Sequence, residues 1–485
     1  METVVKHSVM DEHTSAAARV ECDALGSCFV PRDALYGVQT ARALENFRLS
    51  DVPLNHFPEL VRSLAMVKKA AAIANHAAGG IPQPKFGAIL AACEEIIAGH
   101  HHDAFVVDLF QGGAGTSSNM NANEVIANLA LRTLGLPLAD YGSVHPNDDV
   151  NMSQSTNDVY PTAARLAILL SCPALKLSLR GLIDAFESKG DEFASVVKIG
   201  RTQLQDAVPI TLGQEFAAFA ATLREDVDRL DEASRLFREV NLGGTAVGTR
   251  INASRSYAER AISELSNLSG EPLVAASNLL EASWDAGAFV TFSGILRRIA
   301  VKLSKIANDI RLLSSGPRVG LGEIRLPPMQ PGSSIMPGKV NPVIAESVNQ
   351  VCYQVIGNDL VVTMAAEAGQ LQLNAFEPVM IYNILSSMRL LSRAMSNFDE
   401  RCVRGIEADV ERCRAGAEAS IALATALVPL LGYARAAEVA KTALAQGASV
   451  RDVAISIGIE SDAVERLLDP MRLAEPEGYV SGDIA

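Results

Sequence analysis

The sequence is poor in aromatic residues, which make up 5% of its 485 residues and include one tryptophan. Hydrophobic residues nevertheless reach 48%, so most of them are aliphatic. β-Sheets favour aromatic and β-branched side chains, whereas alanine and leucine lose little entropy in a helix. The composition therefore favours long packed helices over sheets. A chain of this length is sufficient for two or three domains.

An excess of positive charge is also missing, because the net charge is −14 and the pI is about 5.1. A nucleic-acid-binding surface needs a basic stripe, so the charge balance argues against that class of protein. An acidic protein that binds an acidic metabolite must build a local positive pocket against its own field. An anion site is therefore expected among a few lysines, arginines and backbone N–H groups.

The seven cysteines are scattered, odd in number and form no CxxC pair. Such thiols are typical of a reducing compartment, and no metal site is expected. The N-terminus has no continuous apolar stretch of the signal-peptide type. No window is expected to reach the roughly 18 apolar residues of a membrane helix, because Pro173 and Lys176 interrupt the run near Leu166. We expect a cytoplasmic protein.

The chain changes character near residue 155. Before it lies turn-rich sequence with short helices expected at 58–78 and 85–98, and after it come long helical stretches. Apolar residues recur at steps of three and four in these stretches, the spacing of one helix face. Strand patterns are few, so any sheet is minor. The long helices are expected at 159–189, 211–240, 285–313, 343–371 and 379–403.

Five rods of this length form a helix bundle, so the expected fold class is all-α. Rods with apolar surfaces that one chain cannot cover suggest a homo-oligomer. In chain order, the expected parts are a disordered N-terminal tail (1–20), an N-terminal domain (21–155), a central helical-bundle domain (156–404) and a small C-terminal helical domain (405–485).

The segment GSSIMPGKVNP, residues 332–342, has the strongest chemical signal. Prolines throughout 327–342 exclude a helix interior, and two glycines allow close approach to a ligand. A long helix is expected to start at about Val343, and its N-terminus would suit a carboxylate. The ligand-capable side chains of the segment are Ser333, Ser334, Lys339 and Asn341.

Two glycine-rich segments resemble nucleotide-binding loops in sequence. The first is GSSIMPGK at 332–339. A P-loop needs four residues between its glycines and Ser or Thr after its lysine, whereas five residues separate Gly332 from Gly338 and Val340 follows Lys339. GGTAVG at 243–248 lacks the GxGxxG spacing and the preceding strand. Neither segment indicates nucleotide binding.

Three further segments, GAGTSSN, SQSTND and GRTQLQDAVP, are rich in neutral hydrogen-bond donors and precede helices. Ser, Thr and Asn at such places are mostly helix caps, and Asp158 fits that interpretation. Four such segments together argue for one anion site assembled from distant loops. All eight histidines lie at or before His145, so none is near the last segments. The candidate ligands are Thr116, Ser155, Thr156, Asn157, Thr202 and Gln203.

These motifs resemble the aspartase/fumarase superfamily over about residues 20–475. GSSIMPGKVNP looks like its signature, and GAGTSSNMNANEV, HPNDDVNMSQSTND, GRTQLQDAVP, GGTAVGT and DALYGVQTARALENF occur in the expected order. The resemblance implies a homotetramer with a twenty-helix core and active sites built from three subunits. It implies a dicarboxylate or amino-acid substrate and no cofactor, with activation by a divalent ion left open.

Two branches of the superfamily compete. Thr156, Gln203 and GQLQLNAFEPV at 369–379 resemble aspartases, whereas fumarases usually carry Ser and His at the first two positions. Hydroxide is a poor leaving group that benefits from a proton donor such as His, and ammonia needs none. GGTAVGT and PGKVNP do not favour aspartase. Arg250 replaces a residue that is commonly Gly in both branches.

The resemblance implies an ammonia-lyase that converts L-aspartate to fumarate through an aci-carboxylate, with Ser333 as the base. Lys339 and Asn341 would hold one carboxylate, with Ser334 beside them, and the other loops would hold the second carboxylate and the amine. Loop 327–342 is expected to close over substrate. The alternatives are a class II fumarase, a lyase for N-substituted or larger amino acids, and a non-catalytic helical scaffold.

Overall fold

The computed structural model describes residues 17–475. Most of the expected tail, residues 1–16, lies outside this range. Strand β1 (Ala18–Asp23) begins inside the expected tail and pairs antiparallel with β2 (Gly26–Pro31). The ordered chain therefore starts earlier than residue 21.

The chain forms two compact units, and each takes three segments from the sequence. The first unit contains Met1–Ala174, Arg229–Arg297 and Val355–Arg389. The second contains Leu175–Asp228, Arg298–Gln354 and Leu390–Ala485. The domain boundaries expected at 155/156 and 404/405 follow chain order instead, and they stay predictions.

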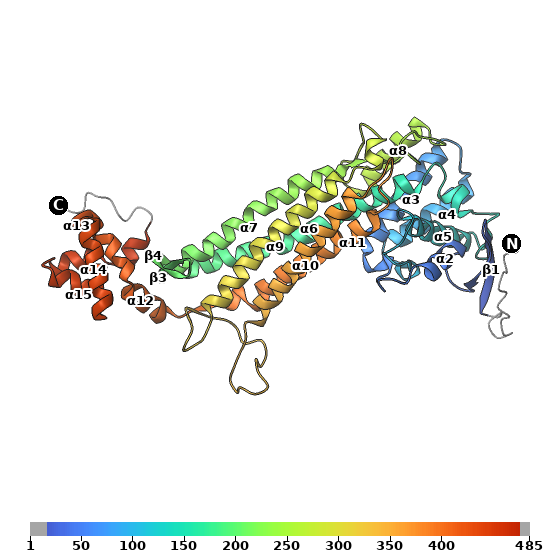
Figure 1. Ribbon diagram of the computed structural model, residues 1–485. Coiled ribbons are helices and arrows are strands. Elements are labelled where there is room, and N and C mark those ends of the chain that lie inside the picture. The colour runs from blue at the N-terminus through green and yellow to red at the C-terminus, as the bar shows by residue number, and fades with distance from the viewer. Residues whose placement is uncertain (1–16, 476–485) are drawn as a thin grey trace, which may run out of the picture. The chain divides into compact units, whose positions relative to one another are not determined.

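The five expected long helices are present (Figure 1). Within the second unit their aromatic residues pack together, with the ring of Phe186 5.7 Å from Phe219 and 6.1 Å from Phe398. The second helix ends at Ser234, earlier than expected, because the chain tightens into a 3₁₀ turn at Arg235–Arg238. The five helices are α6 (Thr156–Glu192), α7 (Leu212–Ser234), α9 (Gly287–Leu313), α10 (Val343–Glu367) and α11 (Glu377–Arg401).

The expected short helices are confirmed as α3 (Pro58–Ala77) and α4 (Gln83–Ile97). They surround α5 (Thr116–Thr133), which is buried from Ser118 to Leu131. Glu124 on α5 accepts backbone N–H groups at the start of α2 (Val38–Asn46), at 2.8–3.1 Å. A distant carboxylate thus caps a helix that has no side-chain cap of its own. The unit also contains α8 (Arg255–Ser269).

Strands are a minor component, as expected. In the described residues they form four two-stranded sheets, β1–β2, β3–β4, β5–β6 and β7–β8. The last six strands are β3 (Val197–Thr202), β4 (Gln205–Thr211), β5 (Glu239–Val240), β6 (Val274–Ala275), β7 (Ile324–Arg325) and β8 (Glu407–Ala408). The chain ends in short helices, α12 (Val410–Ala419), α13 (Val428–Leu431), α14 (Tyr433–Gln446), α15 (Val450–Ser456), α16 (Ser461–Leu467) and α17 (Pro470–Ala474). The mainly helical class is confirmed.

Among the described residues, one continuous helix, α6, is long and apolar enough to cross a membrane. The expectation that no stretch reaches this length was wrong, because the helix continues through Pro161 and Pro173. Half of its most apolar window is buried inside the structure. Length and composition are therefore weak evidence for a membrane span here.

Candidate active site

The first predicted loop, residues 113–119, turns into helix α5. Thr116 opens the helix, and its hydroxyl donates to the carbonyl of Gly113 at 2.6 Å. Gly115 has φ of +89° and lies against the ring of Tyr160, where an added Cβ would be 2.4 Å from a ring carbon. Both the backbone angle and this close approach require glycine. The loop conformation is thereby fixed, with Thr116 exposed.

The second predicted loop, residues 153–158, forms a reciprocal cap at the start of α6. Ser155 Oγ accepts the N–H of Asn157 at 3.3 Å, and the Asp158 carboxylate accepts the N–H of Ser155 at 3.0 Å. This is the arrangement of a capping box, so the interpretation of Asp158 as a helix cap is confirmed. A hydroxyl is one donor and two acceptors, so Ser155 can cap and still donate to a ligand.

Asp158 also ties this loop to the GGTAVG segment. Its second oxygen accepts the N–H groups of Gly243 at 3.0 Å and Thr245 at 2.9 Å. Asn157 adds a bond from its Nδ2 to the carbonyl of Ala246 at 2.8 Å. Asp158 is fully buried, and this burial raises its pKa to about 6 although three N–H groups favour the ionised form. The ionised carboxylate therefore holds two loops together above this pH.

A proline inside α6 creates another link to the same segment. Pro161 has no N–H and cannot pair with the carbonyl of Asn157, four residues earlier. The side-chain amide of Asn241 donates to that carbonyl instead, at 3.0 Å. The start of α6 is thus held by a side chain from a distant loop.

A buried polar network lies behind Thr156. Asn119 Nδ2 donates to Thr156 Oγ1 at 3.1 Å and to Asn151 Oδ1 at 3.3 Å. Lys68 Nζ, on α3, donates to Asn151 Oδ1 at 2.7 Å and to Gln154 Oε1 at 3.0 Å. Lys68 is fully buried, which lowers its pKa to about 7. The network orients Thr156, and sequence analysis missed Lys68 and both asparagines.

A hollow of about 350 Å³ opens beside this network, in the first unit. Ser155 is the predicted residue that lines it. Its lining supplies amides and hydroxyls but no lysine or arginine, so it lacks the positive charge that a dicarboxylate requires. The other polar lining residues include Asn147, Asp148, Asn151, Gln154 and Thr245.

The third predicted loop is the tip of the β3–β4 hairpin, in the second unit. Thr202 pairs with Gln205, which leaves Gln203 and Leu204 as a two-residue turn. Their φ angles are +55° and +61°. Turns with two positive φ angles favour asparagine and glycine, so this turn is strained. Gln203 and Leu204 are exposed at its tip.

The fourth predicted loop, residues 327–342, forms no helix, as its prolines require. Ser333 Oγ accepts the N–H groups of Ile335 at 3.2 Å and Met336 at 2.9 Å. Two backbone donors directed at one oxygen reduce the free-energy cost of negative charge on it. These two bonds form a local turn closed by the serine hydroxyl, and they place two donors at Ser333 Oγ.

The rest of this loop is closed by two hydrogen bonds. Asn341 Nδ2 donates to the carbonyl of Gly332 at 3.0 Å, and the N–H of Gly332 donates to the carbonyl of Lys339 at 2.8 Å. Ser334 and Lys339 are exposed, and the Lys339 ammonium forms no ion pair within residues 17–475. The loop thus presents a cation that the structure itself does not neutralise.

Left-handed backbone conformations of non-glycine residues are frequent in the polar segments quoted from the sequence, including three of the four candidate loops. The described residues include eleven non-glycine residues with positive φ, and six of them lie in the polar segments singled out from the sequence. Such strain persists at functional sites, where the surroundings over-determine the conformation. These six are Ala114, Ser153, Gln203, Leu204, Thr245 and Leu371.

Arg250 is another of the eleven, with φ of +61°. Glycine adopts this angle without steric cost, which explains why glycine is common at the position in the resembling family. The Arg250 Nη1 atom is buried without a hydrogen-bond partner. Arg250 therefore combines an unfavourable backbone angle with an unpaired buried nitrogen, and within residues 17–475 its side chain forms no hydrogen bond that offsets them.

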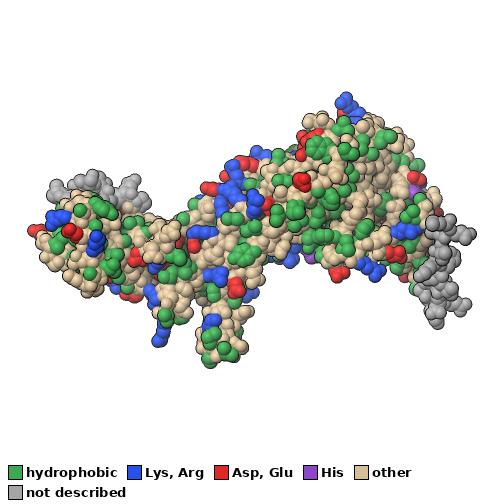
Figure 2. Space-filling view, viewed as in Figure 1, with side chains coloured by type: hydrophobic (Ala, Val, Ile, Leu, Met, Phe, Trp, Pro, Cys, Tyr) green, Lys and Arg blue, Asp and Glu red, His purple; other side chains and the backbone are tan. Residues whose placement is uncertain are grey.

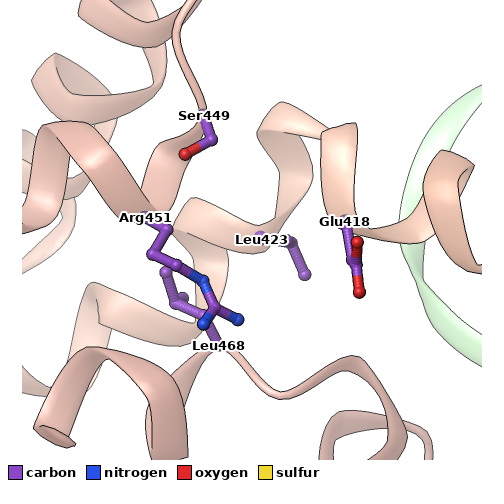
Figure 3. A pocket seen from close by; sticks show the side chains of 5 residues that line it. All are labelled: Glu418, Leu423, Ser449, Arg451 and Leu468. Carbon is purple, nitrogen blue, oxygen red and sulfur yellow. The ribbon is translucent and has the colours of Figure 1, made fainter. Parts of the chain in front are cut away.

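A second hollow, of about 300 Å³, lies among the C-terminal helices and contains none of the predicted residues (Figure 3). Its three polar side chains are engaged, because Ser449 bonds to Asp452, Arg451 lies 3.7 Å from Glu465 and Glu418 lies 3.5 Å from Arg414. Within residues 17–475, no group of three or more His, Cys, Asp or Glu side chains is arranged to hold a metal ion. The hollow is lined by Glu418, Leu423, Ser449, Arg451 and Leu468.

In one chain the predicted residues form two sets. The first unit holds Thr116, Ser155, Thr156 and Asn157, and the last three are joined by the Asp158 and Asn119 networks. The second unit holds Thr202, Gln203, Ser333, Ser334, Lys339 and Asn341. The assignment of all ten residues to one active site stays a prediction.

Comparison with known proteins identifies the family. The lyase family matches residues 26–357, and the fumarase C C-terminal family matches residues 423–475. An aspartate ammonia-lyase of Pseudomonas aeruginosa is 58% identical over 470 residues, covering 96% of this chain and 98% of its own length.

Solved structures agree with this assignment. A fumarate lyase:delta crystallin from Brucella melitensis, bound to cobalt, has a TM-score of 0.93 and 73% identity, covering 95% of this chain and all of its own. A class II fumarase from Schistosoma mansoni has a TM-score of 0.90 and 37% identity, with the same coverage. The chain belongs to the aspartase/fumarase superfamily, and within it is a carbon–nitrogen lyase.

Proposed function

We propose that this protein is an aspartate ammonia-lyase, which reversibly eliminates ammonia from L-aspartate to give fumarate. The observation that carries the mechanism is the pair of N–H bonds to Ser333 Oγ, because they prepare this oxygen to act as a base. The name of the Pseudomonas aeruginosa relative supports the choice of substrate.

The difficult step is removal of the proton from the carbon beside a carboxylate, because that C–H bond is a very weak acid. The barrier falls when donors stabilise the aci-carboxylate formed next, and one well-placed donor is often worth roughly 10²–10³ in rate. We assign Lys339, Asn341 and the N-terminus of α10 to the carboxylate that develops this charge. Ser334 lies beside them. Closure of loop 327–342 would exclude water from the site.

Thr116, Ser155, Thr156, Asn157 and Thr202 are assigned to the other carboxylate and the amine. The protonated amine of aspartate leaves as neutral ammonia and needs no proton donor, so Gln203 can serve as an acceptor for this amine where a fumarase would use histidine. This difference is our reason to prefer the ammonia-lyase over the class II fumarase, which is the second candidate.

We infer that the two sets of residues meet in a homotetramer whose active sites are shared between subunits. Helix α10 supports this assembly, because Tyr353, Leu360 and Met364 share one face and are 59%, 62% and 63% exposed. Hydrophobic side chains are exposed along the long helices in Figure 2. Large apolar side chains in such a row indicate a surface that another subunit covers.

The proposed reaction uses side chains and backbone groups of the protein and no cofactor. The Brucella melitensis relative was solved with cobalt, and activation by a divalent ion stays an open proposal. A cytoplasmic location, expected from the N-terminal sequence, belongs to the same proposal.

The decisive assay follows the ultraviolet absorbance of fumarate when the protein is mixed with L-aspartate. Fumarate should appear, and in the reverse direction it should be consumed only when ammonium is present. Consumption of fumarate without ammonium, giving malate, would establish the fumarase instead. Absence of both reactions would favour the non-catalytic scaffold.

Ser333→Ala tests the base. We expect kcat to fall by at least about 10³-fold, because one substitution removes the base and the oxygen that its two N–H donors serve. The thermal unfolding temperature should change little, since Ser333 lies in a surface loop. Ser456→Ala, which removes a hydroxyl from α15, is the matched control and should keep full activity. Near-normal turnover by the Ser333 variant would refute the assignment.

A further inference from the structure

A buried carboxylate outside the predicted ligands, that of Asp108, joins two loops of the first unit. Its oxygens accept the N–H groups of Leu49 at 3.0 Å, Ser50 at 2.8 Å and Phe110 at 2.8 Å. The Ser50 hydroxyl is a fourth donor, at 2.6 Å. Asp108 is 7% exposed. Four donors therefore converge on one carboxylate that is largely shielded from water.

These donors keep the carboxylate ionised. Burial by itself would raise the pKa of Asp108, but the Ser50 hydroxyl and the backbone N–H groups outweigh burial and lower this pKa. An ionised carboxylate only accepts hydrogen bonds, so it matches four donors without conflict. A neutral amide at the same place would set its own N–H group against some of them.

The backbone around Asp108 is anchored in the core of the unit. The N–H of Leu54 donates to the carbonyl of Val107 at 2.9 Å. The N–H of Leu109 donates to the carbonyl of Val52 at 3.1 Å. Both leucines are fully buried. Asp108 thus lies between two residues of a paired backbone that is held firmly.

Asp108 lies at the start of the loop that leads to Thr116. The side-chain amide of Gln111 donates to the carbonyl of Asp108 at 2.7 Å and to Ser118 Oγ at 2.9 Å. The Gln111 side-chain oxygen accepts the N–H of Ser118 at 3.0 Å. Gln111 therefore ties the anchored end of the loop to the first turn of α5, in which Thr116 is the first residue.

The middle of this loop is strained. Gly113, Ala114 and Gly115 have φ angles of +95°, +53° and +89°, so three consecutive residues adopt left-handed angles. This conformation is unfavourable at Ala114, which is buried, and such strain persists only where the surroundings fix the backbone. The anchor at Asp108 supplies part of this support from the N-terminal side of the loop.

We propose that Asp108 is a positioning residue, which holds loop 109–116 in the conformation that presents the Thr116 hydroxyl to the substrate. This inference rests on the function proposed above, because it treats Thr116 as a substrate ligand. Asp108 and Thr116 belong to the same unit of one chain, so the proposal holds whichever subunit supplies the Ser333 loop. Asp108 acts through the loop and does not touch the substrate.

Asp108→Asn tests the anchor, because it keeps the shape of the side chain and places an N–H group against two of the four donors. The matched control is Glu124→Gln, since the Glu124 carboxylate is also buried and accepts three backbone N–H groups at the start of α2. Glu124 lies on α5, the helix that begins at Thr116, which makes the comparison stringent. Both variants should lose thermal stability.

Amide hydrogen exchange of the full-length protein, measured without substrate, reports on the loop directly. In Asp108→Asn, amides of 110–118 should exchange about tenfold faster or more. In Glu124→Gln they should exchange as in the wild type, whereas amides of 37–40 should exchange faster. Wild-type exchange of 110–118 in the Asp108 variant, or equal acceleration there in both variants, overturns the proposal.

Kinetics show whether the anchor acts through Thr116. Asp108→Asn should lower kcat about 10- to 100-fold with a smaller change in KM, because small misplacements of reacting groups cost rate at this scale. Glu124→Gln should keep its kcat. In a Thr116→Ala background, Asp108→Asn should lower kcat less than about twofold further, because the two changes remove the same interaction. A full additional loss in the double variant, or an equal loss of kcat in both single variants, overturns the proposal.

Ser50 offers a milder test if Asp108→Asn fails to fold. Ser50→Ala removes one donor from the carboxylate, whereas Ser50→Thr keeps the hydroxyl. The alanine variant should exchange faster at 110–118 and have a lower kcat, and the threonine variant should restore both. Absence of either effect in the alanine variant, or of rescue by threonine, overturns the proposal. Wild type that releases no fumarate from aspartate refutes the proposed function, a result distinct from the exchange outcome.

Discussion

Replacement of Lys68 by methionine should make the protein more stable and less active. Lys68 is fully buried, and its ammonium donates to Asn151 and Gln154. Methionine has nearly the same length and no charge, so it fills the space without the cost of burying an ammonium. It also leaves the loop before Thr156 without two of its hydrogen bonds. Removal of the buried charge should raise the free energy of unfolding, whereas loss of the two hydrogen bonds should lower the activity.

The size of the stability gain follows from the pKa of Lys68, which burial lowers from 10.5 to about 7. A shift of this size corresponds to about 5 kcal/mol against the charged form in the folded state. Between pH 7 and 10.5 the unfolded chain binds more protons at this site than the folded one, so stability rises with pH in that window. At about pH 6 the full cost is present, and at about pH 9 roughly 2 kcal/mol of it is left.

Methionine removes this cost but leaves the Gln154 oxygen without its donor, a loss of about 1–3 kcal/mol. The Lys68→Met variant should therefore be more stable than wild type by about 2–4 kcal/mol near pH 6 and nearly equal to it near pH 9. Its kcat should fall about tenfold, because Asn119 and Asn151 no longer hold Thr156 firmly. Loss of the nearby cation should also raise the pKa of Asp158 further.

Chemical denaturation at the two pH values and steady-state kinetics measure these effects. Lys69→Met is the control, because Lys69 is the next residue of α3 and pairs with the exposed Glu94. It should alter neither the pH dependence of stability nor kcat. A stability gain of the Lys68 variant that is the same at both pH values would refute the charge-burial reasoning. Unchanged kcat would show that the network does not serve Thr156.

Two further variants test backbone strain. Arg250→Gly should raise the free energy of unfolding by about 1 kcal/mol, because arginine pays roughly 1–2 kcal/mol for a left-handed φ. A lower denaturation midpoint would instead reveal a role for the Arg250 guanidinium. Leu204→Gly should also stabilise by about 1 kcal/mol, since its side chain is 72% exposed, while the looser turn beside Gln203 lowers kcat. Full activity in that variant would show that the strained turn is not needed.

The long helices could be predicted because their signal is local. Apolar residues at steps of three and four mark α7 and α9 without knowledge of any partner. The same holds for loop 327–342, where closely spaced prolines exclude a helix whatever lies nearby. The predicted ligands Thr116 and Ser155 likewise stand beside helix starts that the sequence indicates.

The anchors of the site could not be found in this way. Lys68 lies in an alanine-rich helix, where a lysine normally marks the solvent face, and its partners are 83 and 86 residues away. Asp158 and Gly243 are separated by 85 positions and meet only in the fold. One local signal did exist, because Pro161 within a helix leaves the Asn157 carbonyl in need of a distant donor.

The cost of these anchors explains how neutral groups can serve a doubly negative intermediate. A hydroxyl without a fixed partner rotates freely, and reorienting it during the reaction would consume the energy that it should supply. Its direction must be set by groups that cannot move. A buried ammonium with two acceptors, such as Lys68, or a buried carboxylate that holds two loops, such as Asp158, meets this need, because breaking its contacts leaves a buried polar group unpaired at a cost of about 1–3 kcal/mol. Loosening either anchor should therefore lower kcat more than it raises KM, since ground-state binding tolerates misalignment that the transition state does not.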